Sequence, residues 1–192
     1  MKSIRKIITE IVRDSHFWGS LWRYSLLIAV IIVLDQWSKL LIQKHFVLGE
    51  ILPVLPGFFN LTQIHNPGAA FGFMAEAGES IRRPLFLFIP VVACLWLVFL
   101  IWQSRKNNIL LGIAYSLIFA GAIGNLIDRF TMGYVVDFLQ FYWRHYYFPS
   151  FNVADSSITI AAGLLIIDFI KNIKASKKMP ASERADHETD PV

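Results

Sequence analysis

The chain has 192 residues, a length that usually corresponds to one domain. Hydrophobic residues account for 55% of the sequence and the mean hydropathy is +0.51, whereas soluble domains are roughly 45–50% apolar even when glycine is counted. The composition therefore indicates a membrane protein. The net charge of +4 does not indicate a nucleic-acid partner, because the basic residues gather at the ends of apolar runs. Cys94 is the only cysteine, which excludes an intrachain disulfide and a multi-cysteine metal site.

Four apolar stretches predict membrane-spanning helices, at about residues 21–44, 84–102, 109–128 and 153–173. The second contains no charged residue, and at about 1.5 Å per residue it is roughly 28 Å long, close to the ~30 Å hydrocarbon core of a bilayer. Each stretch must be helical, because lipid offers the backbone no hydrogen-bond partner. We therefore expect an all-α membrane protein with one membrane-embedded domain over residues 1–178.

The segments outside the spans predict three smaller features. The loop 45–83 mixes prolines and glycines with β-prone pieces such as "FFNLTQI", so we expect a small β-rich platform on the outer membrane face. The segment 1–14 has apolar residues on one helical face and mostly basic residues opposite, which predicts a short interfacial helix. The polar segment 179–192 is expected to be a disordered tail.

The distribution of basic residues predicts the orientation. Twelve of the 18 lysines and arginines lie in the N-terminal segment, in the short turn after the second span, or at the C-terminal end. These places share one side of the membrane if four helices alternate, and the positive-inside rule makes that side cytoplasmic. Loops 45–83 and 129–152 then face outward, and both termini are cytoplasmic.

Several ionisable residues lie inside the spans, where each costs about 2.5–3.5 kcal/mol even on lenient insertion scales. Asp35 and Lys39 stand four residues apart on one helix face, so they form either a self-neutralising structural pair or a support for a site. Asp168 lies near the inner end of the fourth span beside Lys171, and we expect it to pair with that lysine or extend to the interface.

Two glycine-containing motifs stand beside the spans. "HNPGAAFG" (65–72) is a turn signal, but its small residues also let a backbone approach a ligand that Asn66 can hold. His65 has no metal-binding pattern around it. In "FAGAIGNLIDR" (119–129), close helix packing explains the small residues but not Asn125. Asp128 and Arg129 either mark the water interface or belong to a site.

Asp137 and Asp155 flank an aromatic segment near the predicted outer face, and the sequence leaves two interpretations open for them. Asn152 can cap the fourth helix and Asp155, three residues later, can close a capping box with it. Alternatively, the two carboxylates meet and share one proton, as in the aspartic proteases. Spacing alone does not show that they meet.

Five short blocks carry a resemblance to a known family. "DQWSK", "HNPGAAFG", "GAIGNLIDR", "VVDF" and "FNVADSS" each occur once, in this order, around the predicted spans. Together they resemble the bacterial lipoprotein signal peptidases (signal peptidase II). The resemblance implies four membrane helices, an outer β-rich platform and a metal-free aspartic peptidase without a cofactor. It also implies that the enzyme removes signal peptides from prolipoproteins, just before a cysteine that carries a diacylglyceryl group.

The resemblance also assigns roles to residues. It makes Asp137 and Asp155 the catalytic pair. It implies that a second set of residues contacts the substrate or orients the pair: Asn66, Gly68, Asn125, Arg129 and Asn152. It implies that a third set forms a polar scaffold: Asp35, Lys39 and Asp128.

The implied partners are diacylglyceryl-modified prolipoproteins and membrane lipids, with no nucleic acid, and a monomer is expected. The implied location is the bacterial cytoplasmic (inner) membrane, with the active site near the outer face. The alternative is a small ion- or proton-coupled transporter that uses the intramembrane carboxylates as a relay. The absence of an inverted repeat in the sequence argues against it.

Overall fold

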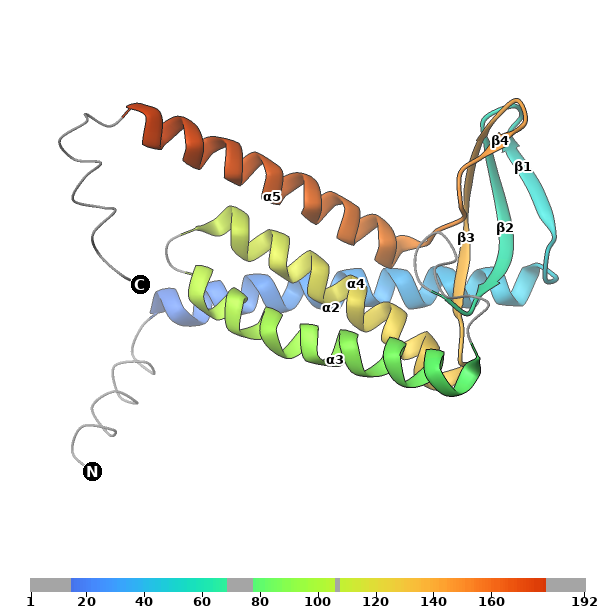
Figure 1. The fold of residues 1–192 in the computed structure, drawn as a ribbon, viewed down its shortest axis with the longest axis horizontal. Coiled ribbons are helices and arrows are strands. Elements are labelled where there is room, and N and C mark those ends of the chain that lie inside the picture. Colours follow the sequence, from blue (N-terminus) through green and yellow to red (C-terminus); the bar gives the residue numbers. More distant parts are fainter. Residues whose placement is uncertain (1–14, 69–77, 106–107, 179–192) are drawn as a thin grey trace.

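The computed structural model describes residues 15–68, 78–105 and 108–178, and these form four long helices and a small antiparallel sheet. The helices are α2 (Ser15–His45), α3 (Glu79–Ser104), α4 (Ile109–Thr131) and α5 (Val153–Lys178). The strands are β1 (Ile51–Leu55), β2 (Phe59–Asn66), β3 (Val135–Trp143) and β4 (Tyr146–Tyr147). Figure 1 shows the sheet across one end of the helices, with its strands roughly perpendicular to them.

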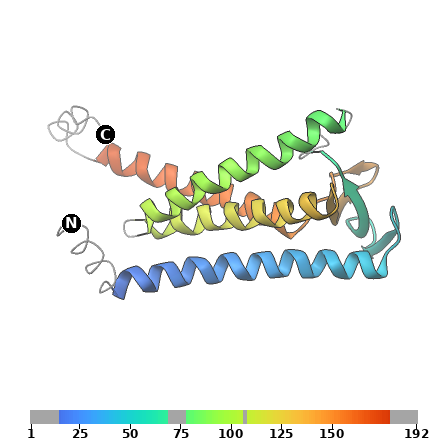
Figure 2. The same ribbon diagram turned by 90° about the horizontal axis from the view of Figure 1, so that it is seen from below.

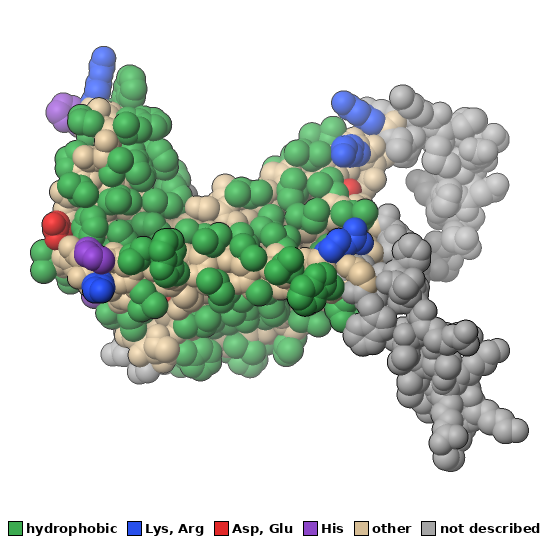
Figure 3. Space-filling view, turned by 180° about the vertical axis from the view of Figure 1, so that it is seen from behind, with side chains coloured by type: hydrophobic (Ala, Val, Ile, Leu, Met, Phe, Trp, Pro, Cys, Tyr) green, Lys and Arg blue, Asp and Glu red, His purple; other side chains and the backbone are tan. Residues whose placement is uncertain are grey.

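All four helices are long and apolar enough to cross a membrane, over Leu21–His45, Pro84–Ser104, Ile109–Thr131 and Val153–Lys174. In Figure 3, hydrophobic side chains cover the middle of the visible face and charged side chains gather toward its two ends. This is the pattern of a bilayer-spanning surface. The expected fold class, a four-helix membrane protein with a small β-rich platform, is confirmed.

Helix α4 is the centre of the bundle. It packs against each of the other three helices and lies between α2 and α3 in Figure 2. Half of its most apolar window is buried inside the protein, compared with 17%, 11% and 22% for α2, α3 and α5. Small residues permit this position. A Cβ atom on Gly121 would lie 2.5 Å from the backbone oxygen of Ala154, so α5 can pack this closely only against a glycine.

The sheet combines strands from both outward loops, in the order β1-β2-β3-β4. Strands β2 and β3 pair antiparallel, with Ile64 opposite Asp137 and Asn66 opposite Val135. The sequence predicted β-prone pieces in the loop 45–83, and the structure adds β3 and β4 from the outer loop 129–152. The run "VVDFLQFYW" is rich in β-branched and aromatic residues, which was the available signal for a strand.

Asp168 differs from its expected role. It is buried and accepts hydrogen bonds from Asn108 Nδ2 (2.7 Å) and Asn172 Nδ2 (3.0 Å). Among the described residues it forms no ion pair with Lys171. Its carboxylate instead fastens the start of α4 to α5, because Asn108 is the N-cap residue of α4. The predicted interfacial helix (1–14) and tail (179–192) lie outside the described residues.

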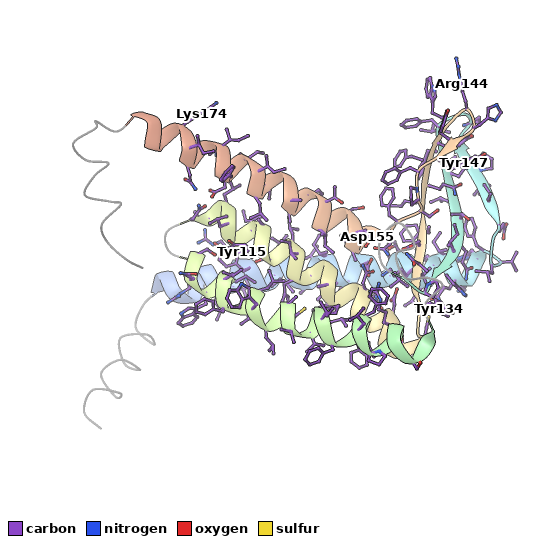
Figure 4. The ribbon with its side chains drawn as sticks, viewed as in Figure 1. Tyr115, Tyr134, Arg144, Tyr147, Asp155 and Lys174 are labelled. Carbon is purple, nitrogen blue, oxygen red and sulfur yellow. The ribbon has the colours of Figure 1, made fainter. Side chains whose placement is uncertain are left out.

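The orientation of the chain is testable with single cysteines. Tyr147 and Lys174, both exposed, lie at opposite ends of the molecule in Figure 4. In a Cys94→Ala background, we expect a membrane-impermeant thiol reagent to label Tyr147→Cys, but not Lys174→Cys, in cells whose inner membrane is intact. Permeabilised cells, in which both cysteines become labelled, are the control. Labelling of Lys174→Cys alone in intact cells would reverse the predicted topology.

Candidate active site

The site begins with the capping of α5, just before its first turn. The Asn152 Oδ1 atom accepts the backbone N–H of Asp155 (2.9 Å), and the Asp155 Oδ2 atom accepts the backbone N–H of Asn152 (3.3 Å). This reciprocal pair is the predicted capping box. Figure 4 shows Asp155 at the end of α5 that faces the sheet.

Strand β3 brings Asp137 to the same place. Asp137 is 2% exposed, and its Oδ1 and Oδ2 atoms accept hydrogen bonds from Asn152 Nδ2 (2.8 Å) and Asn66 Nδ2 (2.9 Å). Burial raises the pKa of Asp137 to about 7, the hydrogen bond from Asn66 opposes that rise, and the Asp155 carboxylate adds to it. The two aspartates therefore lie in one site, and Asn152 binds both. The capping interpretation of Asp155 is confirmed, and Asp137 shares its asparagine; a proton shared between the two carboxyl groups stays a prediction.

Three asparagine amides point their N–H groups at the two carboxylates, because a donor holds the oxygen of each amide. Asn66 Oδ1 accepts the backbone N–H of Gly68 (3.0 Å), and Asn152 Oδ1 accepts that of Asp155. Asn125 Oδ1 accepts a hydrogen bond from Lys39 Nζ (3.1 Å), so that Asn125 Nδ2 donates to Asp155 Oδ1 (2.8 Å). A backbone N–H or an ammonium group can only donate, so the direction of every amide is fixed.

Arg129 supplies a cation beside the pair. Its Nη2 atom donates to the backbone oxygen of Gly68 (3.1 Å), its Nη1 atom donates to that of Asn125 (3.3 Å), and its guanidinium lies 5.5 Å from the centre of the Phe86 ring. The Nε atom is buried and has no hydrogen-bond partner among the described residues. Arg129 therefore keeps one buried donor without a partner among the described residues, and its charge interacts with those of Asp155 and Asp137.

Three charged residues lie deeper and join α2 to α4. Lys39 Nζ forms ion pairs with Asp35 Oδ2 (2.8 Å) and Asp128 Oδ2 (2.9 Å), and all three side chains are at most 2% exposed. Asp35 and Lys39 are thus a structural pair that also reaches the site through Asn125. The interpretation of Asp128 as a marker of the water interface is wrong, because Asp128 is 1% exposed.

Gln36 also belongs to this buried polar group, although its sequence position alone did not indicate it. Its Nε2 atom donates to Asp128 Oδ1 (2.9 Å), to the backbone oxygen of Gly124 (3.1 Å) and to Asp35 Oδ2 (3.2 Å). The signal that was present is a polar amide beside Asp35, inside a predicted span. His65, by contrast, stacks on Tyr134 with ring centroids 3.8 Å apart. The described residues contain no cluster of three or more histidine, cysteine or acidic side chains that could hold a metal ion.

This arrangement suits proton transfer at a bound carbonyl group. Burial raises the pKa of Asp137 to about 7, so this carboxyl is partly protonated at neutral pH, and Asp155 beside it accepts two N–H groups. Such a pair can take a proton from water and give one to an oxygen atom.

The chain is similar in sequence to a known protein family. The sequence model of the family described as "Signal peptidase (SPase) II" matches residues 27–171. Lipoprotein signal peptidases of Desulforapulum autotrophicum and Geobacter metallireducens are 45% and 39% identical over 153 and 155 residues, covering 80% and 81% of this chain and 94% of each relative.

A solved structure agrees with these sequence matches. It is described as a bacterial membrane enzyme determined by the in meso method at 2.3 Å, and it superposes with a TM-score of 0.72 at 34% identity. The match covers 83% of this chain and 94% of the other. The family model spans most of the chain, including every candidate site residue. The chain therefore belongs to the signal peptidase II family, the lipoprotein signal peptidases.

Proposed function

We propose that this protein is an intramembrane aspartic endopeptidase. Its substrates are diacylglyceryl-modified prolipoproteins, and it cuts just before the lipidated cysteine to release the signal peptide. The observation that carries the proposal is the shared amide of Asn152, which caps Asp155 and donates to Asp137. One side chain thereby holds a buried carboxyl group, that of Asp137, and a half-buried one, that of Asp155.

The environments assign the two roles. Asp155 accepts N–H groups from Asn125 and from the backbone of Asn152, and it stands in the first turn of α5, where the helix dipole favours a negative charge. Asp137 also accepts two amide N–H groups, but it is buried in β3 whereas Asp155 is half-buried at the helix N-terminus, so we assign Asp155 as the carboxylate that acts as the base. Asp137, with a pKa of about 7, carries the proton and acts as the acid.

The reaction then follows in two proton-balanced steps. Asp155 takes a proton from water while the water oxygen attacks the carbonyl carbon, and Asp137 gives its proton to the carbonyl oxygen. In the second step the C–N bond breaks. Asp137 recovers the proton from the hydroxyl, and Asp155 passes its proton to the nitrogen of the lipidated cysteine. Both carboxyl groups return to their starting states.

Arg129 is suited to stabilise charge that develops on the substrate. Its buried Nε–H has no partner among the described residues, while the Nη atoms hold the backbone of Gly68 and Asn125. A donor that is already oriented and partly shielded from water stabilises a transition state at little reorganisation cost.

The position of the site suits a membrane-bound substrate. The two aspartates lie where the sheet meets the helices, which we assign to the outer face of the bacterial inner membrane on the basis of the basic residues at the other end. Lipidated prolipoproteins reach that depth by lateral diffusion among membrane lipids, and water enters from the outer side. A monomer contains every group that the mechanism uses.

Replacing either aspartate tests the proposal directly. For Asp137→Asn and Asp155→Asn we expect roughly 100- to 10,000-fold slower cleavage of a diacylglyceryl-modified prolipoprotein in detergent, because an amide can neither take nor supply the proton. The double variant should be little slower than either single variant, since the two residues act as one unit. The loss of capping in Asp155→Asn should cost about 1 kcal/mol or less.

The matched control is Asp168→Asn, which removes another buried carboxylate of α5 that accepts two amide N–H groups. It should cleave within about threefold of wild type, and thermal unfolding of each sample verifies folding. Near wild-type cleavage by Asp155→Asn would reduce that residue to a helix cap. Proton-driven flux without a cleaved product would favour a transporter.

The pH dependence of cleavage follows from Asp137. Its folded-state pKa is raised to about 7, so the acid is protonated below that pH and is lost as the pH rises through it. We expect kcat/KM to fall on the alkaline side of about pH 7, as measured by initial rates in buffers of constant ionic strength. A rate that continues to rise above that pH would show that Asp137 does not act as the acid.

A further inference from the structure

The backbone N–H that precedes Asp155 is held by a carboxylate from another helix. Ala154 is fully buried in the first turn of α5, where backbone N–H groups have no partner within the helix. Its N–H donates to Asp35 Oδ1 of α2 at 2.8 Å. The position of Asp155 therefore depends on where Asp35 stands.

The backbone N–H that precedes Asp137 is held in the same way. Val136 is fully buried in β3, and its N–H donates to Asp128 Oδ2 of α4 at 3.2 Å. Each aspartate of the site thus follows a residue whose N–H is fixed by a buried carboxylate. No feature of the local sequence requires this symmetry.

One ammonium group joins the two carboxylates. Lys39 Nζ lies 2.8 Å from Asp35 Oδ2 and 2.9 Å from Asp128 Oδ2, and it donates at 3.1 Å to Asn125 Oδ1. These three acceptors match the three protons of the group. Asn125 in turn donates to Asp155. Lys39 is therefore linked to Asp155 through Asn125, and to the backbone before Asp137 through Asp128.

The hydrogen bonds of Asp35 and Asp128 require a carboxylate, with two accepting oxygens, at each position. Asp35 receives Ala154 N–H on one oxygen, and Lys39 and Gln36 on the other. Asp128 likewise receives donors on both oxygens. An asparagine has one oxygen, so its own N–H₂ would meet a donor whichever way it turned.

Stability does not explain a buried group of two acids and one base. Such groups carry a desolvation cost that their mutual attraction often fails to exceed, and apolar replacements are frequently as stable. What this group does provide is a fixed separation between the residues that it holds.

We infer that Asp35, Lys39 and Asp128 form a positioning clamp that sets the spacing of Asp137 and Asp155 by holding the backbone N–H before each. The inference rests on the proposed function, because the spacing matters only if the two aspartates react together. A displacement of catalytic groups by about 1 Å can cost about 100-fold in rate without weakening substrate binding.

Gly124 offers a way to displace the clamp without changing a charge. A Cβ atom at this position would lie 2.6 Å from Asp35 Oδ2, so an alanine must push the carboxylate away from its partners. Gly163, in α5, is the matched control, because nothing lies within 4 Å of its added Cβ. Both substitutions replace glycine by alanine inside a helix, which favours the helix itself.

The experiment measures kcat, KM and thermal unfolding for the full chain in detergent with a diacylglyceryl-modified prolipoprotein. We expect Gly124→Ala to lower kcat at least about tenfold and Asp35→Asn and Asp128→Asn at least about 100-fold, with KM within about threefold. Gly163→Ala and Asp168→Asn should stay within about threefold of wild type on both constants. In Gly124→Ala, the alkaline limb of the pH profile should also move, because the two carboxyl groups interact according to their spacing.

A wild-type kcat in folded Gly124→Ala would overturn the clamp. Equal losses of kcat in the controls Gly163→Ala and Asp168→Asn would also overturn it, as would a loss in Gly124→Ala that a smaller folded fraction explains entirely. If the asparagine variants do not fold, the two glycine variants decide the question. A wild-type protein that does not cleave the lipidated substrate contradicts the proposed function instead. Active wild type with unaffected clamp variants contradicts only the clamp.

Discussion

The first backbone N–H groups of α5 belong to buried or half-buried residues and need acceptors within the protein, and the site depends on how this need is met. The side chain of Asn152 binds the N–H of Asp155, and the carboxylate of Asp35 binds the N–H of Ala154. Neither acceptor serves α5 alone. Asn152 also holds Asp137, and Asp35 also holds Lys39. The capping of one helix therefore draws the strand and a second helix into the same network.

Helix α4 makes that network possible because it allows close contact on several sides. Gly121 admits the backbone of α5, and Gly124 admits the carboxylate of Asp35 from α2. The same helix then contributes Asn125, Asp128 and Arg129 on its last turns, directly below the sheet. Small residues that permit packing and polar residues that form the site alternate along one helix, which explains why α4 is more buried than its neighbours.

The site contains more acidic than basic side chains, and this excess determines its electrostatics. Asp35, Asp128 and Lys39 leave one negative charge in excess, and Asp137 and Asp155 add two more carboxyl groups nearby. Amide N–H groups and Arg129 offset only part of this charge, and burial raises the pKa of Asp137 to about 7. The asparagines orient both carboxyl groups by donating to them.

The sequence by itself determined the four spans, because hydrophobic length and the need for internal backbone hydrogen bonds leave a helix as the only solution. It also determined the family, because five short motifs in a fixed order carry the polar residues of the site. Even the capping box was readable, since it is a contact over three residues.

Only the tertiary structure decided which polar groups meet. Pairing of β3 with β2 joins residues about 70 positions apart, and it alone brings Asn66 to Asp137. The burial of Asp128, the role of Gln36 and the partner of Asp168 depend likewise on contacts between helices. Local sequence fixes the periodicity of an element and its capping residues. The acceptor that each donor finds across an interface depends on how closely the helices pack, and here the glycines of α4 set that distance.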